Sequence, residues 1–134
     1  MDLRKVMENE LKSIVVPVLR AAGFTGSLPH FRRLATERME LLTFQFDRHG
    51  GGFVIEAAWC EPDGVVTSWG KAIPATKVTA HDLHPNLRLR IKAKEGSGTD
   101  CWFRYDQGQT KDCAQSVLAS LPKAEQWWAS GGHT

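Results

Sequence analysis

Positive side chains alternate along one stretch of the chain and give the clearest candidate for chemistry. Arg88, Arg90, Lys92 and Lys94 are separated from one another by single apolar residues. A period of two places such side chains together on one face of a strand. Because the planar fork of arginine matches carboxylates and phosphates, we expect a cationic strand face that recognises an acidic or phosphate-bearing partner.

A second alternating run, residues 100–106, follows a glycine-rich turn and predicts a hairpin with residues 87–94. In the register that pairs Ile91 with Phe103, positive side chains surround an aromatic ring on one face. The predicted contact surface has five members: Arg88, Arg90, Lys92, Trp102 and Arg104. Two arginines face each other in this register, which disfavours folding and so indicates a role in binding. The competing interpretation is that these charges only solvate the sheet and protect its edge, and a register shifted by two residues would pair them differently.

Histidines and cysteines could support metal or nucleophilic chemistry, but their spacing is unspecific. His81 and His84 are three residues apart in a polar stretch, where His49 or Cys60 could join them around zinc. Such histidines are more often ordinary exposed loop residues. A nucleophilic Cys60 or Cys101 would need a histidine within hydrogen-bond distance, and no local pattern enforces that contact. We therefore predict no catalytic residue, no metal site and no cofactor.

The composition describes one folded domain with a weak net charge. The chain has 134 residues, a formal charge of +2, 42% hydrophobic and 24% charged residues, which excludes disordered and collagen-like chains. We expect a single domain over residues 1–134, with a fraying tail at about 130–134. Its three separated cysteines fit a reducing compartment, and no stretch approaches the roughly 20 apolar residues of a membrane span. The sequence thus predicts a cytoplasmic protein without a membrane partner, while so few local cations argue against nucleic acid. The oligomeric state is not predicted.

Helical periodicity marks both ends of the chain. From Leu3 to Ala21 the apolar residues share one face of a helix, and Pro17 predicts a kink or a second start near Ile14. Residues 110–120 predict a second helix, and Pro122 is suited to the first turn of a short third one.

Strand periodicity fills the middle of the chain. Residues 39–48 and 52–60 alternate around a glycine-rich turn and predict an antiparallel hairpin, with a short strand over 31–34 before it. The pattern is lost over residues 61–85, which we expect to form a long loop. The predicted fold is α+β: an antiparallel sheet of about five strands with N-terminal and C-terminal helices packed on one face and solvent on the other.

Several short segments occur in the order found in a known family. They are Leu19-Arg20-Ala21-Ala22-Gly23-Phe24, Phe31-Arg32, Phe44-Gln45, Arg88-Leu89-Arg90-Ile91 and a C-terminal helix with a proline near its end. In this order they make the chain resemble the bacterial family called domain of unknown function 4304. The chain departs from the family where Phe46 and Asp47 replace a small polar residue and lysine. The resemblance implies an α+β cytoplasmic domain and supplies no activity, cofactor or catalytic residue.

Two functions follow as expectations. The first is a non-enzymatic binding or interaction module that uses the cationic strand face to hold an acidic protein or an anionic ligand. The alternative is a small-ligand-binding protein or enzyme with a cleft between the sheet and the 61–85 loop, near His81, His84 and Glu56.

Overall fold

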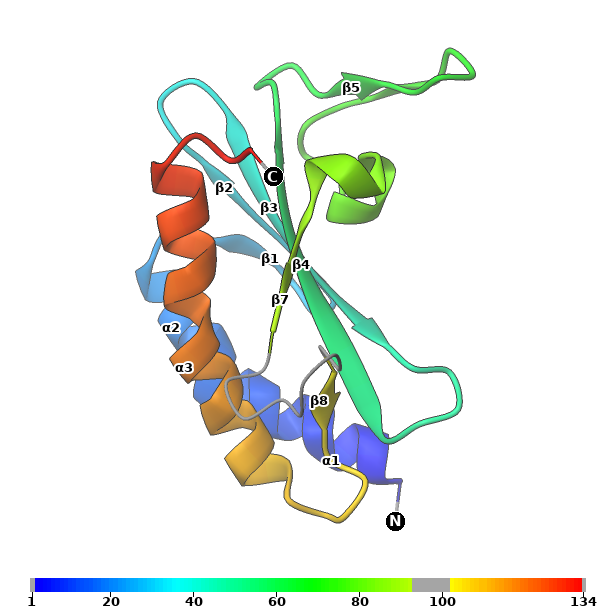
Figure 1. Ribbon diagram of the computed structural model, residues 1–134, viewed down its shortest axis with the longest axis vertical. Helices are drawn as coiled ribbons and strands as arrows, with labels where there is room; N and C mark the ends of the chain where they lie inside the picture. Colours follow the sequence, from blue (N-terminus) through cyan, green and yellow to red (C-terminus); the bar gives the residue numbers. More distant parts are fainter. Residues whose placement is uncertain (1, 93–101, 134) are drawn as a thin grey trace.

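The computed structural model describes residues 2–92 and 102–133, and these form an antiparallel sheet with helices on one face (Figure 1). The main sheet has the order β1-β2-β3-β4-β7, and β8 also pairs with β4. Its strands are β1 (Thr25–Ser27), β2 (His30–Leu34), β3 (Met39–Phe46), β4 (Gly52–Cys60), β7 (Leu89–Ile91) and β8 (Phe103–Arg104). A separate two-stranded sheet consists of β5 (Val65–Val66) and β6 (Ala72–Ile73). The predicted α+β class is confirmed.

The N-terminal helix is interrupted where proline requires it. α1 (Leu3–Glu10) leads into a wider π-helical turn, η1 (Leu11–Val15), and α2 (Val16–Ala21) then starts again. Pro17 lies in the first turn of α2, directly after the π-helical turn in which the Val16 N–H bonds to the Leu11 carbonyl. Because proline has no N–H to donate and crowds the preceding turn, the regular α-helical bonding is interrupted here. At the other end, the side chain of Asp2 caps α1 by accepting a hydrogen bond from the Arg4 N–H at 3.0 Å.

The C-terminal helix is continuous, so the predicted new start at Pro122 is wrong. α3 (Thr110–Ala129) runs through Pro122 for 20 residues. The apolar face continues beyond the proline, where Ala124, Trp127 and Trp128 are buried. Burial of these side chains offsets the one helical hydrogen bond that proline removes.

The helices cover the apolar face of the central hairpin. β3 and β4 pair with Phe46 opposite Phe53, which confirms the predicted hairpin. Phe53 is fully buried, and its ring stacks on Phe103 at 5.4 Å between centroids. Apolar residues of α1, η1 and α3 complete this core, among them Met7, Leu11, Val15, Ala114 and Val117.

The opposite face is partly covered, contrary to the expectation of an open face. Residues 61–88 fold over it as the β5–β6 hairpin followed by two short 3-10 helices, η2 (Ala80–Asp82) and η3 (Pro85–Leu87) (Figure 1). A small second core lies beneath this segment and contains Leu41, Ala58, Cys60, Val78 and Ala80. The stretch without periodicity therefore has a defined packing role.

Within the described residues, the predicted hairpin of residues 87–94 and 100–106 is not formed, so this prediction is wrong. β7 and β8 both pair with β4, with Ile91 opposite Ile55 and Phe103 opposite Phe53. The long edge of β4 offers both short segments backbone partners and directs both apolar side chains into the helix-covered core. Residues 93–101, which contain the predicted turn and Lys94, lie outside the described residues.

Candidate functional site

The outer edge of β4 positions the cationic side chains that the sequence singles out. Arg90 lies opposite Glu56 and Arg104 opposite Gly52, four residues apart along one strand. At about 3.3 Å per residue this separates the two arginines by about 13 Å. Their neighbours Ile91 and Phe103 enter the helix-covered core, so both arginines project from the face that the helices leave uncovered. They do not oppose each other across a hairpin, and the predicted repulsion between them is absent.

Arg88 belongs to a buried cluster around Glu56. The Glu56 Oε1 atom lies 3.1 Å from Arg88 Nη1, 3.5 Å from His81 Nε2 and 3.6 Å from Arg90 Nη2. Arg88 also donates hydrogen bonds to two backbone carbonyls of the covering segment, those of Leu83 at 2.8 Å and His81 at 3.3 Å. Its guanidinium therefore fastens residues 81–88 to the sheet.

Exposure separates Arg88 from Arg90. The Arg88 side chain is 15% exposed and that of Arg90 is 44% exposed. Lys92 and Arg104 are also exposed, and the Arg104 guanidinium lies 5.5 Å from the ring centroid of Trp102. Four of the five predicted contact residues thus lie on or beside one strand edge, which we call the cationic edge: Arg90, Lys92, Trp102 and Arg104.

The histidines support the covering segment. Burial lowers the pKa of His30 and of His81, and the Nδ1 atom of His30 lies 3.2 Å from Thr43 Oγ1. His84 accepts the N–H of Asn86 at its own Nδ1 and so caps η3. Over residues 2–92 and 102–133, no group of three or more His, Cys, Asp or Glu residues is placed to hold a metal ion.

The described cysteines are buried thiols. Burial raises the pKa of Cys60 to about 11 and that of Cys113 to about 12. A nucleophilic cysteine needs a lowered thiol pKa and access to solvent, so neither fits that role. Cys101, the other nucleophile considered, lies outside the described residues.

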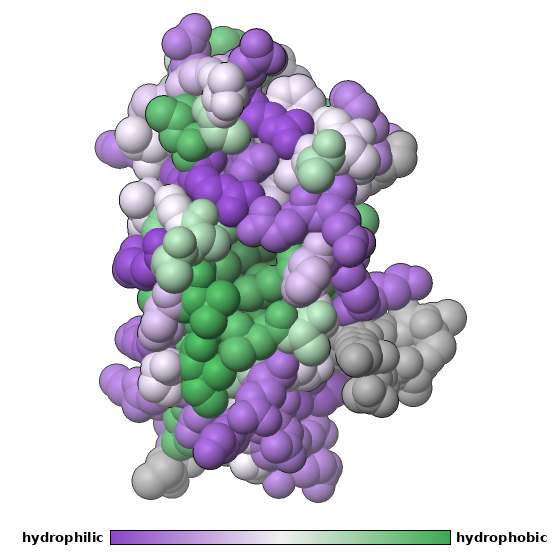
Figure 2. Space-filling view, turned by 90° about the vertical axis from the view of Figure 1, so that its left-hand side faces the viewer, coloured by the Kyte–Doolittle hydropathy of each residue, from purple (hydrophilic) through white to green (hydrophobic). Residues whose placement is uncertain are grey.

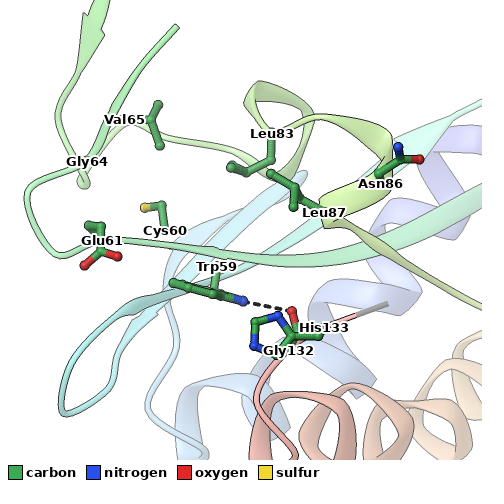
Figure 3. A pocket seen from close by; sticks show the side chains of 10 residues that line it. All are labelled: Trp59, Cys60, Glu61, Gly64, Val65, Leu83, Asn86, Leu87, Gly132 and His133. Carbon is green, nitrogen blue, oxygen red and sulfur yellow. Dashed lines mark hydrogen bonds between the residues drawn. The ribbon is translucent and has the colours of Figure 1, made fainter.

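Hollows of different character lie near these side chains and elsewhere on the surface. One of about 640 Å³ lies between the β5–β6 hairpin and η2–η3, and His81, His84 and Arg88 are among its lining residues. A second, of about 370 Å³, opens at the end of β4 beside Trp59 and Leu87 (Figure 3). The sequence suggested a cleft near residues 61–85, but it gave no signal for the second hollow, because that hollow depends on where the pairing of β4 with β7 stops.

A third hollow is apolar and lies between α2 and α3. It has a volume of about 340 Å³, and its walls include Val18, Leu118 and Leu121. Figure 2 shows a continuous hydrophobic surface on this side of the molecule. It carries neither the charges nor the titratable groups that the sequence singled out.

No helix within the described ranges is both long enough and apolar enough to cross a membrane. The family model of a domain of unknown function (DUF4304) matches residues 15–131. Because that match covers most of the chain, the protein belongs to this family, which confirms the resemblance. No curated protein and no solved structure matches the chain.

Proposed function

We propose that this member of the DUF4304 family is a binding module that recognises an acidic or phosphate-bearing partner through the cationic edge. The observation that carries the proposal is the placement of Arg90 and Arg104 on one helix-free face of the same strand edge, both exposed to solvent.

The cluster around Glu56 leaves Arg90 able to turn toward a partner. Arg88 approaches the carboxylate more closely, at 3.1 Å against 3.6 Å for Arg90. Because Glu56 keeps Arg88 when Arg90 moves, binding does not leave a buried charge without a partner, which would be costly. Arg90 can therefore exchange a long internal contact for a bidentate one with a carboxylate or phosphate.

At the other end of the cationic edge, the ring of Trp102 favours one orientation of the Arg104 guanidinium. A guanidinium over an indole ring gains about 0.5–1 kcal/mol at an exposed site. At 5.5 Å from the ring, Arg104 is held near one orientation before a partner arrives. Tryptophan and arginine are also the residues most often found to dominate protein interfaces.

The test compares two double variants that change the charge equally. In Arg90→Gln/Arg104→Gln the cationic edge is altered, and in Arg20→Gln/Arg48→Gln two exposed arginines elsewhere are altered. We expect the affinity for fluorescein-labelled decaglutamate to fall about tenfold in the first and less than about twofold in the second. Equal losses in both would show that only the net charge matters and would overturn the proposal. A phosphoserine peptide of the same length tells whether phosphate is preferred to carboxylate.

A small-ligand site is the second candidate, and the hollow of about 640 Å³ favours it because Arg88, His81 and His84 lie in its wall. Titration with succinate, followed by amide chemical shifts, separates the two ideas. Shifts over residues 65–69 and 81–88 would assign the anion to the hollow, whereas shifts over 90–92 and 102–104 would assign it to the cationic edge.

A further inference from the structure

β4 extends beyond the end of β7, and a walled groove lies at this part of its outer edge. β7 begins at Leu89, opposite Ala57, while β4 continues beyond this pair to Cys60. Within the described part of the chain, no strand pairs with residues 58–60 on this side. On this side the edge presents the backbone N–H and C=O of Trp59, because alternate residues of β4 bond to β3, and such unpaired groups can bond to another extended chain.

Side chains form two walls on either side of that edge. Figure 3 shows the indole of Trp59 on one side of the β4 ribbon and Leu83, Leu87 and Val65 on the other. Successive residues of a strand point to opposite faces, so Trp59 and Cys60 can line one hollow only around the backbone edge. The hollow of about 370 Å³, which we call the edge groove, is therefore a channel with the strand backbone at its base.

The walls are in place before any ligand arrives. Trp59 donates its indole N–H to the carbonyl of Gly132 at 2.9 Å, and the guanidinium of Arg38 lies 5.6 Å from its ring centroid. On the other side Leu87 is 55% exposed and contributes apolar surface to the wall together with Leu83 and Val65. A pre-organised apolar site of this kind loses little entropy on binding.

We propose that the edge groove takes one extended peptide segment, which adds to β4 as a short strand of about three residues. Alternate side chains of the segment pack against Trp59 and against the Leu83–Leu87 wall, because a strand presents them to opposite faces. Among the described residues that line the groove, Glu61 is the one carboxylate and there is no lysine or arginine, so a basic residue belongs at that end of the peptide. Walls on both sides admit a single chain and exclude the layered edge of a second folded copy.

This surface is separate from the cationic edge and prefers the opposite charge. It lies at the Cys60 end of β4, whereas Arg104 lies opposite Gly52 at the other end of the strand. The Arg90→Gln/Arg104→Gln variant should therefore bind the peptide as well as the unchanged protein does.

Fluorescence polarisation with labelled hexapeptides tests the proposal. Two probes alternate valine and threonine and end in lysine or in glutamate. Two more carry N-methyl groups on alternate amides of the lysine peptide, one in each of the two possible frames. We expect the lysine peptide to bind at least about fivefold more tightly than the glutamate peptide. N-methylation in one of the two possible frames should abolish binding, because strand addition needs those backbone N–H groups.

Exposed substitutions locate the site without disturbing the fold. Glu61→Lys should reverse the charge preference, and Glu37→Lys, an exposed control, should not. Leu87→Asp should weaken binding of the lysine peptide about tenfold. Val66→Asp, at a residue that is 73% exposed and lies outside the edge groove, should leave that affinity unchanged. Peptide binding should also slow hydrogen exchange of the Trp59 and Glu61 amides, which face the outer side of β4.

Several results would overturn the proposal. The first is the absence of binding by every peptide at about 1 mM. The others are binding that ignores N-methylation in both frames, and equal losses of affinity in Leu87→Asp and Val66→Asp. Self-association of the protein that protects residues 58–61 would assign the groove to a second copy instead. The N-methylation comparison uses the unchanged protein, so it stands even if a variant fails to fold.

Discussion

The two faces of the sheet are covered by different kinds of structure. On one face, helices bury a continuous apolar core that includes Phe44, Phe53 and Phe103. On the other, an irregular segment covers a smaller apolar cluster and is attached by polar side chains. Arg32 donates its Nε–H to the Val78 carbonyl at 2.7 Å, and Thr43 accepts the Ala80 N–H at 3.0 Å. The packing on the first face therefore depends on the apolar area that is buried, and the attachment of the segment on the second face depends on individual hydrogen bonds.

The positive side chains on this second face fall into two groups, those that bond to the covering segment and those that are exposed to solvent. Arg32 and Arg88 bond to backbone carbonyls of the covering segment, so they serve the fold. Arg90 and Arg104 lie on the same face but remain exposed at its outer edge. The irregular cover thus bonds to some of the positive side chains of the sheet, while others remain exposed beside it.

The largest expected effect distinguishes the two cores. Phe53→Ala removes a ring that contacts Phe44, Phe46, Phe103 and Tyr105, and should lower the free energy of unfolding by about 3–5 kcal/mol. Val78→Ala, beneath the irregular cover, should cost about 2 kcal/mol for the two methyl groups lost. Urea unfolding followed by circular dichroism measures both. Equal losses would show that the two faces contribute alike.

The next comparison separates the structural arginine from the exposed one. Arg88→Met leaves the buried Glu56 carboxylate without its closest partner and should cost about 3 kcal/mol. Arg90→Met removes a longer contact of a half-exposed side chain and should cost less than about 1 kcal/mol. The same urea titration provides the measurement, and a larger loss for Arg90→Met would reverse the roles that we assign.

Acid should weaken the irregular cover. Burial lowers the pKa of His30 and of His81, so the unfolded chain takes up protons at higher pH than the native protein does. The free energy of unfolding should be highest above pH 6.5 and should fall as the pH drops from that value through the lower native pKa. His81→Gln should reduce this decline between pH 7.5 and pH 5, and His49→Gln, at an exposed histidine, should not. Stability that rises on acidification would contradict the assignment.

The smallest effect is a difference in labelling rate between two buried thiols. Cys60 lies under the irregular cover and Cys113 under the helices. In a Cys101→Ser variant, maleimide should modify Cys60 faster, because a cover held by few contacts opens without global unfolding. Mass spectrometry of the digested protein gives both rates. Faster modification of Cys113 would mean that the helices open first.

Sequence periodicity was sufficient for the parts of the fold that bury one regular face. The β3–β4 hairpin follows from strict alternation, and the interrupted first helix follows from Pro17. Periodicity could not tell whether residues 87–94 would pair with residues 100–106 or with another strand, because both arrangements bury Ile91 and Phe103. The available edge of β4, a tertiary feature, decided between them.

The candidate site was predictable in its residue types and not in its connections. Alternation correctly placed Arg90 on a face away from the apolar core. Alternation could not predict the hydrogen bond from Arg88 to the Leu83 carbonyl, because a contact between a side chain and an irregular backbone segment follows no periodic sequence pattern. The sequence did not indicate Trp59 and Leu87 as site residues for a related reason. The groove between them exists only beyond the Ala57–Leu89 pair, where the pairing of β4 with β7 stops.

The most direct test of the recognition surface is protection of individual arginines by a bound acidic ligand. The protein is treated with phenylglyoxal in the presence and absence of decaglutamate, and mass spectrometry reports the modification of each arginine. We predict that the ligand protects Arg90 and Arg104 while the exposed Arg20 and Arg48 react as before. Equal protection of all four arginines, or protection of Arg20 and Arg48 alone, would contradict recognition at the outer edge of β4.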